Sequence, residues 1–171
     1  MTWNDYFLAL FDSCCASYRG GARQFEKFYS GEDRAYLATI GYQTREFFDF
    51  VEDHCESGDP SASTALLVAA VRRDYFLTIQ KGVTSERQLT AEELPSFGHQ
   101  LEGLAYLPRI LAKARAKLRG ELDPDVMFGC GGDRNFLSKH GSIPPADFLR
   151  RVWAVGDNDA KLVAWIKAQT A

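Results

Sequence analysis

Apolar residues recur at steps of three and four over most of the chain, which is the spacing of one face of an α-helix. The first stripe runs from Trp3 to Tyr18, where Thr2 can cap its start and Gly20 can stop it. A stretch from about Ser63 to Gln80 also predicts a helix, although residues 75–79 alone fit a strand as well. The run 65–71 inside it is apolar on all sides, which indicates a central position surrounded by other helices.

Capping residues, prolines and glycines mark the remaining helices. Ser30 with Asp33 resembles a capping box, Gly41 can end the helix that it opens, and Thr44 can cap the next one. Pro108 suits the first turn of a helix over residues 107–119, which Gly120 can close. Three more helices are predicted over residues 133–140, 145–155 and 159–169, and two irregular segments over residues 82–99 and 121–132. The pattern therefore predicts an all-α protein of seven to eight helices.

Two stretches of the chain repeat each other. Asp33–Leu37 aligns with Asp133–Leu137, and Gly41 then falls on Gly141. The similarity extends over residues 33–71 and 133–166, as expected of two related helical units around one core. The alternative is that short capped helices reuse Asp, Gly and Phe for the same local reasons.

Composition narrows the class of protein. With 171 residues, 46% of them hydrophobic, the chain suits one compact domain over residues 1–171. A net charge of -3 argues against nucleic acid as a partner, so a helix-turn-helix at Gly41 or Gly141 is the weakest reading. No apolar run approaches the length of a membrane span, which predicts no membrane association. The acidic start of the chain and four cysteines without a CxxC pair favour a cytoplasmic protein with reduced thiols.

The most unusual stretch is Met127–Arg134, where three glycines flank a thiol just before a predicted helix. Glycine allows close approach of a ligand, and a helix N-terminus can hold an anion or lower the pKa of a nearby thiol. Cys130 and Asp133 are therefore the candidate catalytic residues, and Gly131, Gly132 and Arg134 are candidate ligand contacts. The alternative is a buried thiol in a tight turn, with Asp133 capping the helix.

Cations on two helices add candidate anion contacts. Arg109 and Lys113 lie four residues apart and can bind a carboxylate or phosphate, or they pair with the acids of the predicted helix after Thr44. Arg72 and Arg73 interrupt an apolar helix, so they either orient an anionic ligand or form an internal ion pair with Asp33, Asp49 or Asp133.

No metal site and no cofactor are predicted. Glu46, Asp49 and Asp53 can share a helical face, but a helical metal site would need Glu-x-x-His pairs on more than one helix. Neither a P-loop nor a dinucleotide fingerprint is present in the sequence. His99 and His140 are isolated and fit surface or cap positions.

The segments Leu107–Gly120, Cys130–Asp133, Phe136–Leu137, Pro145–Phe148 and Leu162–Trp165 resemble a bacterial family known as domain of unknown function 5069. The resemblance is strongest over residues 95–168, and residues 46–76 resemble the N-terminal part of its longer members. It implies a cytoplasmic bacterial helical protein and brings no activity, cofactor or catalytic residue with it.

These observations lead to two hypotheses about function. The first is a cleft for a small anionic metabolite between the basic helix 107–119 and the Cys130 loop, with cofactor-independent lyase, isomerase or hydrolase chemistry if it is an enzyme. The second is a non-catalytic interaction module, such as a homodimer or a partner-binding surface of exposed aromatic residues.

Overall fold

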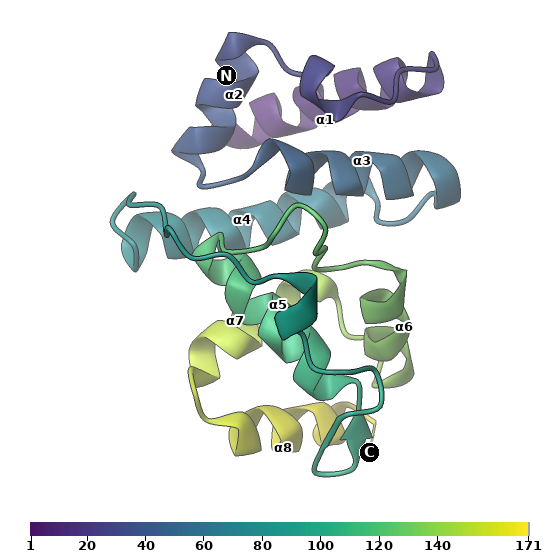
Figure 1. Ribbon diagram of the computed structural model, residues 1–171, viewed down its shortest axis with the longest axis vertical. Helices are drawn as coiled ribbons and strands as arrows, with labels where there is room; N and C mark the ends of the chain where they lie inside the picture. The colour runs from purple at the N-terminus through teal and green to yellow at the C-terminus, as the bar shows by residue number, and fades with distance from the viewer. Residues whose placement is uncertain (171) are drawn as a thin grey trace. The chain divides into compact units, whose positions relative to one another are not determined.

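The computed structural model describes residues 1–170 and confirms the all-α prediction, with eight α-helices in the described chain. They are α1 (Trp3–Arg19), α2 (Gly31–Thr39), α3 (Thr44–Ser57), α4 (Ala62–Thr78), α5 (Leu107–Arg119), α6 (Gly131–Lys139), α7 (Pro145–Val155) and α8 (Asp159–Gln169) (Figure 1). Two short 3-10 helices, η1 (Phe25–Lys27) and η2 (Ala91–Glu93), and an antiparallel hairpin of β1 (Gln100–Leu101) and β2 (Leu104–Ala105) join them.

The chain divides into two compact units, Met1–Thr84 with α1 to α4 and Ser85–Ala171 with α5 to α8. The sequence prediction of one domain over residues 1–171 stays a prediction. Within residues 1–170, none of the helices combines the length and the apolar character that crossing a membrane requires.

The N-terminal unit is built on the contact of α1 with α3. Thr2 and Asp5 form a capping box that starts α1, as the sequence predicts for Thr2. Phe7 and Phe47 lie at the centre of the unit, with their rings edge to face and their centroids 4.9 Å apart. Such aromatic pairs bury large apolar surfaces and add a geometric preference, which fixes how the two helices pack.

The C-terminal unit is built on α5, which packs against α7, while α7 packs against α8. The apolar stripe of α5 includes Leu107 and Ile110, both fully buried, and Phe148 of α7 is fully buried as well. Leu89 donates its backbone N–H to the carbonyl oxygen of Glu121 and forms a parallel bridge with Leu122. This bridge ties the irregular segment before α5 to the irregular segment that follows it.

Several local predictions were wrong. Thr44 begins α3 but does not cap it, because Gln43 occupies the N-cap. Residues 75–78 continue α4, which confirms the helix predicted over this stretch, and the alternative of a strand at residues 75–79 is wrong. Leu67 has an exposed fraction of 47%, so the apolar run of α4 is not covered on every side. The hairpin at residues 100–105 was not predicted, since its strands have only two residues each and leave no period in the sequence.

Candidate functional site

A pocket of about 280 Å³ opens in the C-terminal unit. Three segments line it: the irregular segment around η2, the first two turns of α5 with the residue before it, and the segment leading into α6. The lining residues are Ala91, Leu94, Phe97, Tyr106, Arg109, Lys113, Asp125, Val126, Met127, Cys130 and Gly132. All of them lie within residues 91–132, so one unit supplies the whole pocket.

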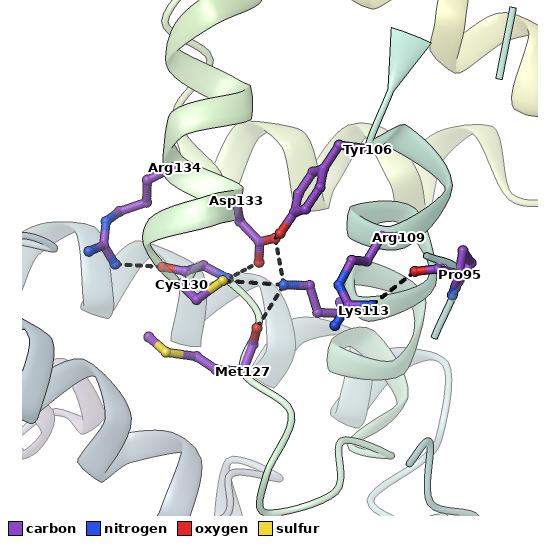
Figure 2. A network of polar contacts seen from close by, with 9 residues as sticks. Pro95, Tyr106, Arg109, Lys113, Met127, Cys130, Asp133 and Arg134 are labelled. Atoms are coloured by element: carbon purple, nitrogen blue, oxygen red, sulfur yellow. Dashed lines mark hydrogen bonds and ion pairs between the residues drawn. The ribbon is translucent and has the colours of Figure 1, made fainter. Parts of the chain in front are cut away.

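Asp133 is the centre of the polar network behind this pocket (Figure 2). Its side chain is completely buried and lies in the first turn of α6. Oδ1 accepts hydrogen bonds from the Tyr106 hydroxyl at 2.8 Å and from Lys113 Nζ at 2.5 Å, and Oδ2 accepts the backbone N–H of Gly129 at 2.8 Å. A buried carboxylate needs such partners, because burying an unpaired charge is very costly.

Lys113 extends from α5 into the same network, and its side chain is 4% exposed. Besides Asp133, its Nζ contacts the carbonyl oxygen of Met127 at 3.1 Å and Cys130 Sγ at 3.4 Å (Figure 2). A lysine ammonium has three N–H donors, and three acceptors surround this one. Lys113 therefore has no donor left for a ligand, and its charge lies beside the sulfur.

Cys130 occupies the N-cap of α6, and its half-buried side chain faces the pocket. The first N–H groups of an α-helix have no acceptor within the helix, so the thiol lies where the helix dipole is positive. Arg134 donates from Nη1 to the carbonyl oxygen of Gly129 at 2.7 Å and so closes the turn that presents the thiol.

Tyr106 joins the pocket to the buried carboxylate. It precedes α5 in a left-handed conformation, with φ of 73°, which directs its ring towards α6. Burial raises the pKa of its hydroxyl above the ordinary range, and the negative charge of Asp133 raises this pKa further. A Cβ on Gly132 would lie 2.8 Å from the Tyr106 hydroxyl oxygen, so only glycine leaves room for this contact.

Arg109 lines the pocket and has N–H donors without an acceptor in the described residues. Its Nη1 donates to the carbonyl oxygen of Pro95 at 2.9 Å, and its guanidinium lies 4.2 Å from the ring centroid of Phe97. A guanidinium has five N–H donors, and among residues 1–170 this is the one hydrogen bond that Arg109 makes. The remaining donors are available to an anion in the pocket.

The structure brings together most of the residues singled out in the C-terminal half of the sequence. Arg109, Lys113, Cys130 and Gly132 line one pocket, and Asp133 lies directly behind it. Gly131 and Arg134 belong to the turn but do not line the pocket. Three cations of α5 also pair with acids of their own unit: Lys113 with Asp133, Arg115 with Asp159 and Arg119 with Glu121.

Arg72 and Arg73 belong to the N-terminal unit and do not line this pocket. Arg72 is buried, donates to the Gln80 side-chain oxygen at 2.6 Å and lies over the ring of Phe76. Arg73 pairs with Asp74 and lies over the ring of Trp3. Among residues 1–170, no group of three or more His, Cys, Asp or Glu side chains is placed to hold a metal ion.

Sequence reasoning missed Tyr106 and Phe97. Tyr106 is one apolar residue among many before Pro108, and nothing in its neighbourhood indicates a left-handed residue that reaches Asp133, 27 positions away. Phe97 lies in an irregular segment without a period, yet it stacks on Tyr106 with ring centroids 5.9 Å apart.

Comparison with protein families gives a match to the segment that forms this site. Residues 91–171 match the family described as domain of unknown function DUF5069. This match confirms the resemblance seen over residues 95–168, and it does not extend to residues 46–76. Every residue that lines the pocket lies inside the DUF5069 segment. No curated protein and no solved structure matches the chain.

Proposed function

We propose that the DUF5069 segment binds a small anionic metabolite, most naturally a carboxylate, in the pocket between α5 and the Cys130 turn. The observation that carries this proposal is Arg109, a half-buried cation in the pocket wall with only one of its N–H donors in use. Its planar guanidinium matches a carboxylate or phosphate with two parallel hydrogen bonds.

The size and lining of the pocket restrict the ligand further. A volume of about 280 Å³ lies at the lower end of ligand sites, which favours a ligand the size of a small metabolite. Ala91, Leu94 and Val126 supply apolar surface around Arg109. Asp125 is the negative residue of the lining, but it is exposed, so solvent screens its charge.

Any chemistry in this pocket falls to Cys130. Asp133 is fully buried and accepts three hydrogen bonds, and the three donors of Lys113 are in use, so both act as positioning residues. A thiol with these partners supports lyase, isomerase or hydrolase chemistry without a cofactor.

Thermal-shift titration with small carboxylates, phosphates and sugar phosphates tests the binding proposal. A ligand that prefers the folded state raises the unfolding temperature in a saturable way. We expect a carboxylate to do so with the wild-type chain and not with Arg109→Gln. Arg150→Gln is the matched control, because Arg150 is a half-exposed arginine of the same unit whose partner is Asp147. A flat response across the panel would overturn the proposal, and so would an equal shift in Arg109→Gln.

Phe97 favours a second candidate function, a homodimeric or partner-binding module. Phe97 has an exposed fraction of 68%, so it presents an aromatic ring to solvent at the pocket. Mass measurement by light scattering over a range of concentrations distinguishes the candidates. A dimer that Phe97→Ser converts to a monomer would favour the module, and a monomer at every concentration would remove the homodimer.

A further inference from the structure

Several helix boundaries in the two units lie 100 residues apart. α2 spans Gly31–Thr39 and α6 spans Gly131–Lys139. Likewise α1 ends at Arg19 and α5 at Arg119, each followed by a glycine C-cap. Within each unit, the first helix packs against the third.

A polar contact repeats along with the helices. The Tyr6 hydroxyl donates to Asp33 Oδ1 at 3.0 Å, as the Tyr106 hydroxyl donates to Asp133 Oδ1 at 2.8 Å. In both units the tyrosine lies on or just before the first helix and the aspartate in the first turn of the second helix. The tyrosine–aspartate contact is therefore part of the framework.

The residues of the pocket are what differ. Ala9, Ser13 and Ser30 stand at the positions of Arg109, Lys113 and Cys130. The N-terminal unit shows that this arrangement of helices forms without a guanidinium, an ammonium or a thiol at these places. Asp33 is only half-buried whereas Asp133 is fully buried, so the C-terminal unit alone buries a lysine ammonium beside its aspartate, at a cost in desolvation. We take these three residues as an addition that serves the ligand.

We propose that Cys130 is a nucleophile that bonds covalently to small carboxylates bearing an electrophilic carbon, which Arg109 anchors and Lys113 assists. This inference rests on the proposed function, because Arg109 must first hold the carboxylate. Cys130 is the nucleophile that remains, since the Tyr106 hydroxyl is donated to Asp133 and the Lys113 ammonium is saturated with acceptors.

The covalent step needs no further reagent. With an α,β-unsaturated carboxylate, Sγ forms a bond to the β-carbon, the π pair moves to the α-carbon, and that carbon takes up the proton that the thiol gave to water. With a haloacetate, the S–C bond forms as the carbon–halogen bond breaks, and the halide and the thiol proton leave to solvent. The Lys113 ammonium, 3.4 Å from Sγ, attracts the negative charge that the sulfur carries as its proton leaves.

A pair of alkylating reagents tests this directly, because iodoacetate carries the carboxylate and iodoacetamide is its neutral counterpart. Rates at Cys130 are measured by peptide mass spectrometry, and the same chain unfolded in urea gives the intrinsic ratio of the two rates. We expect folding to raise the ratio of iodoacetate to iodoacetamide at Cys130 by about tenfold or more, as a charge-assisted contact to Arg109 implies. In Arg109→Gln the ratio should return to the unfolded value, and in Arg150→Gln it should not change.

Ser30→Cys provides a control built into the chain. It places a thiol at the matching N-cap of α2, beside the same tyrosine–aspartate contact but without the arginine and lysine counterparts. We expect no preference for iodoacetate at residue 30. An equal preference at residues 30 and 130 would attribute the effect to the helix N-terminus and overturn the proposal.

Cys130→Ser separates the failure of this inference from the failure of the proposed function. An unreactive carboxylate such as propionate should still stabilise Cys130→Ser in an Arg109-dependent way. Suppose that propionate stabilises Cys130→Ser, but that Cys130 in the folded wild-type chain shows the same ratio of iodoacetate to iodoacetamide rates as in the unfolded chain. The proposal of Cys130 as a nucleophile is then wrong, and the proposed binding site remains. If propionate binds neither chain, the proposed function fails first.

The contribution of Lys113 is tested with the neutral pair Lys113→Met/Asp133→Asn, which removes both buried charges together and so limits the risk of unfolding. Circular dichroism establishes that the variant is folded. We expect slower alkylation of Cys130 by both reagents with an unchanged ratio between them, because the anchor Arg109 is intact. Unchanged rates with both reagents would overturn the role of Lys113.

Discussion

Lys113 and Asp133 form a buried ion pair whose removal has a predictable cost. Their side chains are 4% and 0% exposed, and their charged atoms are 2.5 Å apart. In Lys113→Met the Asp133 carboxylate keeps the Tyr106 hydroxyl and the Gly129 N–H but loses its counter-charge. Breaking a buried pair on one side costs about 3–5 kcal/mol, and we expect this destabilisation of the C-terminal unit.

The double variant provides the sharper test of this reasoning. Lys113→Met/Asp133→Asn leaves no buried charge, and the amide oxygen of the new residue can still accept from Tyr106. We expect the double variant to lose only about 1–2 kcal/mol, the order of the hydrogen bonds that are not replaced. The losses of unfolding free energy in Lys113→Met and Asp133→Asn, added together, would then exceed the loss in the double variant. The difference is the coupling energy between the two residues.

Urea unfolding followed by tryptophan fluorescence in a Trp3→Phe background, where Trp153 and Trp165 of the C-terminal unit remain, measures these free energies. Arg150→Met is the surface control, because Arg150 and Asp147 are 49% and 54% exposed and such pairs contribute about 1 kcal/mol at most. A loss in Lys113→Met no larger than that of Arg150→Met would refute the buried pair. If the free-energy losses of the two single variants add up to the loss of the double variant, the coupling is refuted.

Three further predictions concern Gly132, Tyr106 and two buried thiols of the N-terminal unit. Gly132→Ala should destabilise the chain by about 1–3 kcal/mol in urea unfolding, because its Cβ would lie 2.8 Å from the Tyr106 hydroxyl oxygen. Gly131→Ala is the control and should not destabilise the chain, because a Cβ at residue 131 would have no atom within 4 Å. Tyr106→Phe should lower the free energy of unfolding by about 1.5–3 kcal/mol in the same measurement, which is the order of a hydrogen bond to a charged group. An unchanged free energy would mean that Asp133 does not need the hydrogen bond from Tyr106. Burial raises the pKa of Cys14 and of Cys15 to about 12 from 9.0, so the stability that their protonated forms supply is present below pH 9 and lost as the pH rises towards 12. Unfolding free energies at pH 8 and pH 11 check this, and native-state labelling of both thiols at pH 8 as fast as in urea would contradict it.

The sequence predicted the helices well because their signals are local. Pro108 and Gly120 bound α5 within one residue, and Ser30 with Asp33 opens α2 as a capping box. The same local reasoning failed for Leu67, because the apolar content of a helix does not say how many faces its neighbours cover.

The candidate site could be predicted only in part. Arg109 and Lys113 fall on one face by their spacing, and Cys130 stands out among glycines, so their residue types led to one pocket. Their roles could not be read from the sequence, since role depends on partners that lie far away along the chain. Asp133 fitted a cap or a catalytic acid equally well, and only its three hydrogen bonds identify it as a buried acceptor.

The two units allow structural and functional residues to be separated within a single chain. Tyr6 with Asp33 and Tyr106 with Asp133 make the same contact, which therefore accompanies the helices of both units. The N-terminal unit has serines at residues 13 and 30, and its Asp33 is only half-buried, whereas Asp133 is fully buried. Lys113 therefore supplies the counter-charge of an aspartate that only the C-terminal unit buries completely, and the chemistry proposed for the pocket falls to Cys130. The DUF5069 match lies within the C-terminal unit. It spans residues 91–171 and so includes Arg109, Lys113 and Cys130.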